Sequence, residues 1–304
     1  MNDSRHPAGM VIPHHRLPPG FTESIGREVS EPAVPRPAAT VVLLRDGPNG
    51  PEALLLLRQR RTGFVPGAYV FPGGRVDPAD DDDRLAGLLS GLDSGEPARA
   101  SWVAAARELF EETGVLLARA ADAAADGGPQ QDPALAAAET GLPPARTADN
   151  AVADDPRLDP ALAAARIALL EDRTTLYDVL HANALRLDLS GMVYFAHWIT
   201  PVVEPRRFDT RFFLAALPPG QRAAHDPREM DDAVWLTPAA ALARFHEGSM
   251  PMVFPTVHSL ELIDGFATVA AVLAAFRGCE VRTVLPRLAH CPEGVELIVD
   301  PEVS

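Results

Sequence analysis

The sequence predicts an α/β fold in which a mixed β-sheet carries helices and insertions. Short apolar runs typical of strands lie both before and after an isolated helical pattern, and their connections show no regular strand–helix alternation. The 304 residues are 47% hydrophobic and 23% charged, a composition typical of a folded globular protein that can bury a sizeable core.

The first part of the chain predicts a tail followed by a hairpin. Residues 1–36 are rich in proline among polar residues, so we expect a poorly ordered tail or strap, with one domain over residues 37–304. Apolar runs at 40–44 and 53–57 flank a turn-rich cluster and predict two paired strands. A third strand is expected at 68–71, before Pro72, Gly73 and Gly74 force a tight turn.

One helix is sharply punctuated. It is expected from Pro97 to Thr113, because proline suits a first helical turn and Gly114 suits the residue after the last one. We expect a helical, alanine-rich insertion over about 118–190, interrupted by a proline- and aspartate-rich loop near 127–160. The remaining predictions are strands at 192–199, 212–217 and 233–236, helices at 238–246 and 259–276, and short strands within 281–299.

Composition excludes several classes of function. The net charge of −15 disfavours general nucleic-acid binding, and the absence of lysine excludes Schiff-base chemistry and a Walker-type lysine. Cys279 and Cys291 have no metal-binding or disulfide-framework spacing. Without an apolar run of about 18 residues or a signal-peptide core, we expect a cytoplasmic protein with no membrane association.

The chemistry is concentrated on the predicted helix. Glu108, Glu111 and Glu112 have i, i+3 and i+4 spacing, which places three carboxylates on one helix face. An acidic solvent-exposed face is the ordinary interpretation of such a run. The alternative is a site for Mg²⁺ or Mn²⁺, because these hard ions take oxygen ligands and bridge carboxylates to phosphate. Arg107, one turn before Glu111, is placed to orient that carboxylate.

The run from Arg107 to Val115 resembles the second half of the Nudix box, R-E-U-x-E-E-x-G-U with U aliphatic. The resemblance to Nudix hydrolases implies a Nudix α/β/α sandwich with a mixed sheet, in which the helical insertion at about 118–190 is a candidate cap over the active site. It also implies hydrolysis of a nucleoside diphosphate linked to another group, with Glu108, Glu111 and Glu112 holding the metal.

The first half of the box departs from the family pattern, in which a glutamate follows the initial glycine by six positions and the arginine follows it by fourteen. Here Gly74 and Arg107 are 33 positions apart, so about 19 extra residues lie inside the box. Counting back eight from Arg107 gives Arg99 instead of a glutamate. Asp77 and Glu96 are alternatives for this carboxylate, and the sequence does not decide between them.

Further motifs resemble the organellar acyl-CoA diphosphatase type of Nudix protein and its bacterial relatives. They are the run from Phe64 to Asp77, the segment from Trp198 to Pro201, and the segment from Arg206 to Phe213. This resemblance implies that the small-molecule nucleotide substrate is CoA or acyl-CoA, cleaved to 3′,5′-ADP and (acyl-)phosphopantetheine. Alternatives are a pyrophosphatase for ADP-ribose or NADH, and a Nudix-fold binding protein without catalysis. A homodimer is compatible with each.

Arginine clusters in this acidic chain are candidates for substrate binding. Arg206 and Arg207 are suited to bidentate capture of phosphate, and Arg60 and Arg61, next to Arg58, form a second cluster; exposed strand ends are the competing interpretation for both. Glu229, six residues before Trp235, resembles a late metal-binding or general-base glutamate of Nudix proteins. Asp226, Asp231 and Asp232 compete for that role.

Overall fold

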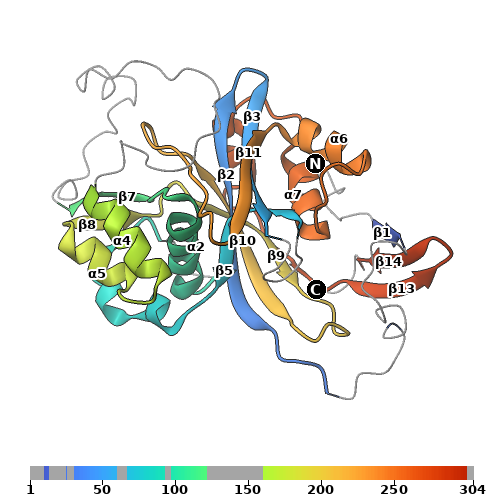
Figure 1. Cartoon of the computed structure of the whole chain (residues 1–304), viewed down its shortest axis with the longest axis horizontal. Coiled ribbons are helices and arrows are strands. Elements are labelled where there is room, and N and C mark those ends of the chain that lie inside the picture. Colours follow the sequence, from blue (N-terminus) through green and yellow to red (C-terminus); the bar gives the residue numbers. More distant parts are fainter. Residues whose placement is uncertain are drawn as a thin grey trace.

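A mixed eight-stranded sheet forms the centre of the molecule (Figure 1). The structure is a computed structural model, and it describes residues 10–13, 25, 31–59, 67–92, 97–121 and 160–299. Strand order is β11-β3-β2-β10-β9-β12, with β4 beside β3 and β5 beside β2. Strand β10 runs parallel to β2 and antiparallel to β9, so the predicted mixed sheet is confirmed.

The strands of this sheet are β2 (Arg36–Gly47), β3 (Gly50–Arg58), β4 (Tyr69–Val70), β5 (Gly73–Arg75), β9 (Val193–Ile199), β10 (Phe208–Ala216), β11 (Met230–Leu236) and β12 (Thr283–Val284). The helices are α2 (Arg99–Thr113), α4 (Pro160–Leu170), α5 (Leu176–Ala182), α6 (Pro238–His246), α7 (Phe254–Ile263) and α8 (Val269–Phe276). Two short 3-10 helices, η2 (Pro78–Asp81) and η3 (Asp83–Leu88), lie between β5 and α2.

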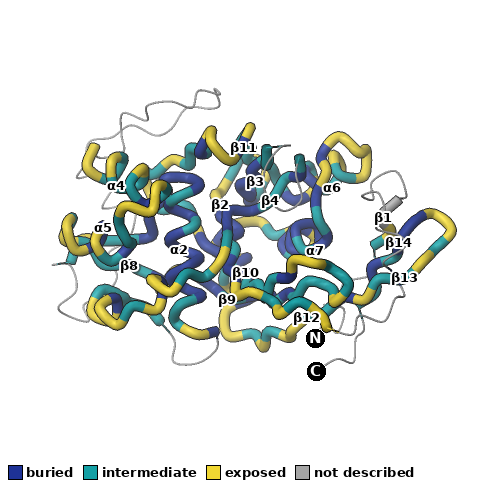
Figure 2. The backbone as a smooth tube through the Cα atoms, turned by 60° about the horizontal axis from the view of Figure 1, so that its bottom comes forward, coloured by how far each residue is buried: buried dark blue, intermediate teal, exposed yellow. Residues whose placement is uncertain are grey.

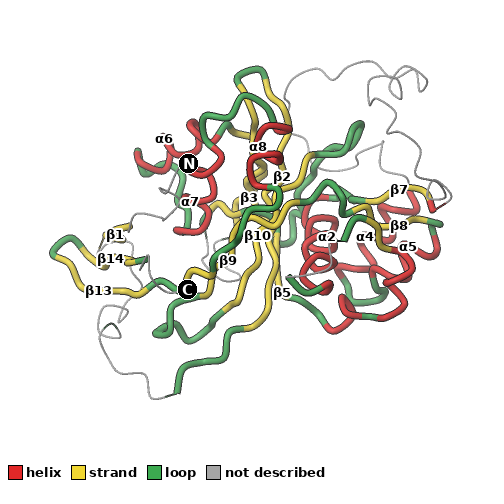
Figure 3. The backbone as a smooth tube through the Cα atoms, turned by 180° about the vertical axis from the view of Figure 1, so that it is seen from behind, coloured by secondary structure: helices red, strands yellow, loops and turns green. Residues whose placement is uncertain are grey.

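Helices cover both faces of the sheet, and the alternation of side chains in β2 shows why. Val41 and Leu43 pack in one apolar cluster with residues of α2, whereas Val42 and Leu44 pack in a second cluster with residues of α7 and α8. Figures 1 and 3 show α2, α4 and α5 on one side of the sheet and α6, α7 and α8 on the other. Figure 2 shows buried chain in β2, α2 and α7, with exposed turns on the outer side of α4 and α5.

The predicted hairpin and the punctuated helix are present. Strands β2 and β3 pair antiparallel next to the turn at 47–50. Helix α2 ends at Thr113, and Gly114 follows with φ of 73°, a left-handed conformation that glycine adopts without strain. Helix α6 has the predicted bounds, Pro238–His246.

The stretch predicted as a helical insertion also contains strands, which is a correction. Helices α4 and α5 lie between β7 (Ala118–Ala120) and β8 (Leu185–Asp188), while residues 122–159, including the predicted loop, lie outside the described residues. Strand β8 also pairs with β6 (Leu89–Ser90), which belongs to the extra residues inside the box. These short strands are stabilised by pairing between distant segments, a contribution that helix propensity does not record.

The helix predicted at 259–276 is also a correction, because the chain forms two helices there. Helix α7 begins earlier, at Phe254, and ends at Ile263. Gly265 has φ of 79°, and the Thr268 hydroxyl accepts a hydrogen bond from the Ala271 amide to cap α8. A left-handed glycine followed by an N-cap threonine stops one helix and starts another.

A separate three-stranded sheet joins segments near the two ends of the sequence. Its order is β1-β14-β13, with β1 (Met10–Pro13), β13 (Arg287–Cys291) and β14 (Gly294–Ile298). Strand β1 lies within the segment expected to be a tail, and it pairs antiparallel with β14. Among the described helices, none combines the length and apolar character needed to cross a bilayer.

Candidate active site

Helix α2 places its carboxylates against the end of β5. Gly74 of β5 lies so close to Glu108 that a Cβ atom there would come within 2.4–2.6 Å of the Glu108 carboxylate. One turn further along the helix, Glu112 is 4% exposed and its Oε2 accepts a hydrogen bond of 2.9 Å from the Gly73 amide. The two glycines therefore form a cradle that receives two carboxylates of one helix.

Arg107 organises the neighbouring carboxylates. Its Nε and Nη2 atoms donate to both oxygens of buried Asp80 at 2.8 and 3.0 Å, and Nη2 also donates to the Arg75 carbonyl at 2.8 Å. Its Nη1 donates to Glu108 at 3.0 Å and to Glu111 at 2.9 Å. The guanidinium thus fixes β5, η2 and the acidic turn of α2 relative to one another.

Arg58 and Glu229 act on the inner carboxylate, Glu112, from β3 and from the chain before β11. The positive charge of Arg58 lowers the pKa of Glu112, whereas the negative charge of Glu229 raises it. The Gln59 amide donates to the Glu229 carbonyl at 3.1 Å, which holds the two segments side by side. Glu229 itself is exposed, so its carboxylate is accessible at the edge of the site.

Burial and mutual repulsion shift the titration of the helix carboxylates. Burial is the largest influence on Glu108 and raises its pKa to about 7, although Arg107 acts in the opposite direction. The pKa of Glu112 is raised well above its ordinary value, first by burial and then by Glu108. The pKa of Glu111 is also raised by burial. The pKa values of the three glutamates are thus raised by burial and mutual repulsion more than Arg107 and Arg58 lower them.

The oxygen-donor set fits a divalent cation. Glu112 is buried, the negative charge of the partly buried Glu108 disfavours its ionised form, and Gly74 leaves room for the Glu108 carboxylate. Hard cations such as Mg²⁺ stabilise this kind of group. Within the described ranges, no three acidic, histidine or cysteine side chains are gathered around one point. Instead, Nη1 of Arg107 lies between Glu108 and Glu111 and bonds both.

Comparison with known protein families agrees with this geometry. The family model described as "NUDT19 Nudix domain" matches residues 92–263, more than half of the chain, and the general "NUDIX domain" model matches residues 34–139. The chain belongs to the Nudix hydrolase family. Within it, the chain falls in the NUDT19 branch, and the resemblance drawn from the sequence is confirmed at this level.

Curated relatives and one crystal structure resemble this Nudix protein over most of its length. The acyl-coenzyme A diphosphatase NUDT19 of Xenopus laevis is 23% identical over 282 residues, covering 80% of this chain and 68% of the relative. That of Gallus gallus is 27% identical over 297 residues, covering 81% and 73%. A NUDIX hydrolase from Alicyclobacillus acidocaldarius superimposes with a TM-score of 0.62 at 26% identity, covering 82% of this chain and 99% of that one.

The Nudix box contains a carboxylate that the sequence interpretation missed. Asp80 follows Gly74 by six positions, the spacing of the family's first glutamate, and its side chain binds Arg107 with both oxygens. The spacing from Gly74 identifies Asp80, because no extra residue lies between them. The spacing from Arg107 fails, because the extra residues lie between the two positions. Of the two alternatives, Asp77 lies 3.6 Å from Arg107 with a half-exposed side chain, and Glu96 lies outside the described residues.

The predicted substrate arginines have different surroundings. Arg60 and Arg61 lie outside the described residues, and Arg206 is exposed. Arg207 is buried, and its guanidinium donates to the carbonyls of Thr200 at 3.0 Å and Ala33 at 2.9 Å. In this structure Arg207 therefore joins the segments that contain Ala33 and Thr200. A contact between Arg207 and a phosphate stays a prediction. Of the aspartates that compete with Glu229, Asp226 is buried and accepts hydrogen bonds from Arg228.

Proposed function

We propose that this protein hydrolyses the diphosphate of CoA or an acyl-CoA to 3′,5′-ADP and (acyl-)phosphopantetheine. The observation that carries this proposal is the match of the NUDT19 domain model, supported by curated relatives that are named acyl-coenzyme A diphosphatases. A Nudix-fold binding protein without catalysis would be favoured by the absence of the first carboxylate of the box, but Asp80 follows Gly74 by the family spacing and bonds Arg107.

The helix carboxylates would hold Mg²⁺ or Mn²⁺, with Glu108, Glu111 and Glu112 as oxygen donors and Glu229 beside them. A bound divalent cation supplies charge compensation for the diphosphate and an activated water. The water oxygen forms a bond to one phosphorus, the bridging phosphorus–oxygen bond breaks, and the bridging oxygen leaves with the second phosphate. Arg107 orients Glu111 and Glu108 throughout, because it bonds both carboxylates and is itself fixed by Asp80.

The proton released by the attacking water needs an acceptor, for which Glu108 and Glu229 are the two candidates. Glu108 is partly buried next to Gly74, whereas Glu229 is exposed at the edge of the site. Glu108→Gln and Glu229→Gln distinguish them. Loss of the general base should remove the increase of kcat with pH that accompanies deprotonation of that base. Loss of a residue that only binds metal should instead raise the metal concentration required for activity.

Substrate recognition would use further arginine side chains. We assign this role to Arg60 and Arg61, which follow β3, and to Arg206 and Arg207 between β9 and β10. An arginine fork matches a phosphate in a bidentate manner, and the substrate carries a 3′-phosphate in addition to its diphosphate. Replacing Arg60 and Arg61 together is expected to raise KM for CoA more than KM for an analogue that lacks the 3′-phosphate.

The direct test is product analysis by mass-resolved chromatography. The purified protein is incubated with Mg²⁺ or Mn²⁺ and, in parallel, CoA, acetyl-CoA, a long-chain acyl-CoA, ADP-ribose and NADH. We expect 3′,5′-ADP from the CoA compounds and at least a hundredfold less of it from Glu112→Gln. Preferential formation of AMP from ADP-ribose or NADH would contradict the substrate assignment, and no product with either metal would contradict the enzymatic proposal.

A further inference from the structure

The C-terminal end of α2, which carries Glu111 and Glu112, is closed by three different segments. A helix leaves its last four carbonyls without partners inside the helix. Here the Phe110 carbonyl accepts from the Gly114 amide at 2.8 Å, the Glu112 carbonyl from the Asp226 amide at 3.1 Å, and the Thr113 carbonyl from the Ala224 amide at 2.8 Å. The remaining carbonyl of this turn, that of Glu111, accepts from a side chain.

That side chain is Arg166, and it comes from α4 in the helical insertion. Its Nε donates to the Glu111 carbonyl at 2.9 Å, and its Nη2 donates to the Ala224 carbonyl at 2.9 Å. Its Nη1 lies 3.2 Å from the place that a Cβ on Gly114 would take. The planar fork therefore bridges the end of the catalytic helix and the chain that precedes β11, which pass side by side on one side of the sheet (Figure 1).

The bridged chain leads directly to Glu229. From Ala224 it runs to Asp226, whose carbonyl accepts from the Glu229 amide at 3.2 Å and from the Met230 amide at 3.0 Å. A displacement of this chain would therefore move Glu229 relative to Glu112. Arg166 also interacts with this region through its charge, because Asp226 and Glu112 are the negative groups that act on it.

The charge of Arg166 suits its place at the helix end. A cation at a helix C-terminus interacts favourably with the partial negative charge of the last carbonyls, and a charged hydrogen bond is stronger than a neutral one. A neutral side chain would lose this interaction and leave the Glu111 carbonyl without its partner. The acidic turn and the chain that carries Glu229 would then be joined only by the two backbone hydrogen bonds from the Ala224 and Asp226 amides, which hold their relative position less firmly.

We propose that Arg166 is a positioning residue through which the helical insertion fixes Glu112 and Glu229 relative to one another, so that both can contribute to binding a divalent cation. This inference rests on the proposed hydrolysis only for its activity readout. The insertion would then contribute to the active site, because one of its side chains sets the geometry of the carboxylates. Arg166 does not touch the reacting atoms.

The test compares Arg166→Ala, Arg166→Lys and the control Arg173→Ala. Arg173 is an exposed arginine that follows the same helix and pairs only with Glu171 among the described residues. Mn²⁺ binding is measured by electron paramagnetic resonance, kcat and KM by product analysis, and folding by thermal unfolding. Arg166→Ala is expected to weaken Mn²⁺ binding at least fivefold and lower kcat at least tenfold, with KM changed less than threefold.

The lysine variant separates positioning from simple destabilisation. Lysine keeps the charge at the helix end but cannot present two parallel N–H groups to two carbonyls, so Arg166→Lys is expected to recover the melting temperature more completely than kcat or Mn²⁺ affinity. The proposal is overturned if Arg166→Ala lowers only the melting temperature and binds Mn²⁺ like the wild type. Mn²⁺ affinity is measured without substrate, so a wrong substrate assignment leaves this result intact.

Discussion

Arg107 shows at the residue scale how a buried cation depends on its partners. Burial alone would lower the pKa of the guanidinium, but Asp80, Glu108 and Glu111 together raise it. Asp80 is the most buried of these carboxylates, at 1% exposure, and it bonds Arg107 with both oxygens. It lies in an acidic run whose other members pair with surface arginines, as Asp83 does with Arg99 at 3.3 Å.

We predict that Asp80→Ala lowers both the free energy of unfolding and kcat. The free energy should fall by about 2 kcal/mol, because a buried arginine loses two charged hydrogen bonds. The kcat should fall at least tenfold, because Arg107 would no longer be fixed by Asp80 and would orient Glu108 and Glu111 less well. Urea denaturation and product analysis measure the two effects. Asp83→Ala is the matched control, and equal losses in both variants would show that Arg107 does not depend on Asp80.

A second polar network lies on β9, β10 and β12. His197 bonds Asp209 through Nε2 and the Thr283 hydroxyl through Nδ1 at 2.8 Å, and Arg211 pairs with Asp209 at 2.8 Å. Burial raises the pKa of Asp209, but the hydrogen bonds of His197 and Arg211 outweigh it, so the net shift is downward. The folded protein therefore binds the Asp209 proton less tightly than the unfolded chain does.

This sign gives a prediction about acid stability. A depressed carboxyl pKa contributes stability that is complete above the unfolded pKa of about 3.9 and disappears as pH falls through the lower folded value. Asp209→Asn should cost about 1 kcal/mol at pH 7 and progressively less below about pH 4. Urea unfolding across pH 7 to 3 tests this, with Asp172→Asn at an exposed site as the control. Parallel curves for wild type and Asp209→Asn would contradict it.

At the scale of elements, we expect the candidate active site to depend on how closely α2 approaches β5. Gly74→Ala would place a Cβ atom 2.4–2.6 Å from the Glu108 carboxylate, which is the free end of a flexible side chain. The carboxylate can therefore rotate away, so we expect a melting temperature within about 3 °C of wild type. The kcat should nevertheless fall about a hundredfold, because Glu108 leaves its position in the site.

Gly87→Ala provides the control for this prediction. Gly87 lies in η3, between β5 and α2, and a Cβ there would meet nothing within 4 Å. Thermal unfolding and kcat are measured for both variants with saturating metal. If Gly74→Ala keeps full activity, close contact between β5 and Glu108 is not required for catalysis.

The same elements show what sequence reasoning reached and what it did not. Helix α2 and the hairpin of β2 and β3 carry local signals, namely glycine and proline punctuation and paired apolar runs, and both were predicted. The break between α7 and α8 also has a local signal, Gly265 with Thr268, which the apolar pattern concealed. The strands β6, β7 and β8 have no such signal, because their stability comes from one another.

In the candidate active site too, the residues with a local sequence signal were predictable and those that depend on distant contacts were not. The spacing of Glu108, Glu111 and Glu112 on one helix was readable, and so was the position of Asp80 once the count starts at Gly74. The role of Arg166 could not be predicted from the sequence. Its partners are backbone carbonyls 55 and 58 residues away, and any residue can supply a carbonyl.

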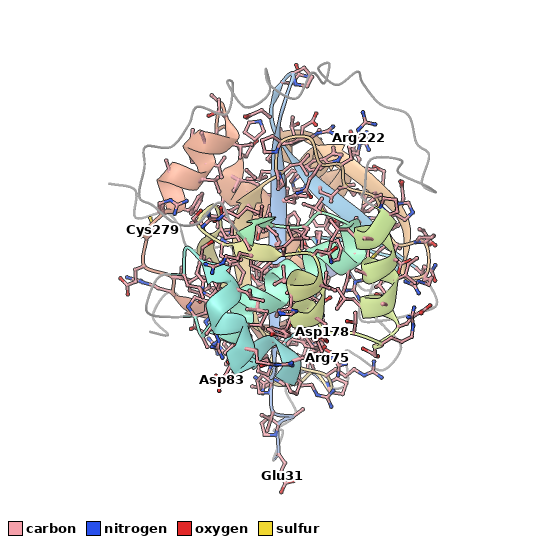
Figure 4. All side chains as sticks on the ribbon, turned by 90° about the vertical axis from the view of Figure 1, so that its left-hand side faces the viewer. Glu31, Arg75, Asp83, Asp178, Arg222 and Cys279 are labelled. Atoms are coloured by element: carbon pink, nitrogen blue, oxygen red, sulfur yellow. The ribbon has the colours of Figure 1, made fainter. Side chains whose placement is uncertain are left out.

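At the scale of the whole molecule, the two insertions depend on each other. The extra residues inside the box end in β6, which pairs in parallel with β8 of the helical insertion. In Figure 4, which looks onto this side of the molecule, Asp83 of η3 and Asp178 of α5 are labelled on the elements in front of the sheet. The Arg84 guanidinium lies 4.2 Å above the ring of Tyr177 in α5. The insertions thus form one layer over α2.

Gly91 lies closely against Ser190 where the two insertions meet, and this contact leads to a prediction for the whole layer. It has φ of 76°, and a Cβ there would come within 2.3–2.5 Å of Ser190, including its backbone. Backbone cannot rotate away as a side chain can, so Gly91→Ala should lower the free energy of unfolding by about 2–3 kcal/mol. Gly191→Ala, where a Cβ would meet nothing within 4 Å, is the control.

Hydrogen exchange measured by mass spectrometry shows where the stability is lost. If the insertions form one layer, Gly91→Ala should increase exchange in β7 and β8 together with α4 and α5, while β2 and β3 keep their protection. Because Arg166 projects from α4 to the end of α2, amides near Glu112 should also exchange faster, and kcat should fall with them. Faster exchange confined to residues next to Gly91 would mean that the two insertions are held independently.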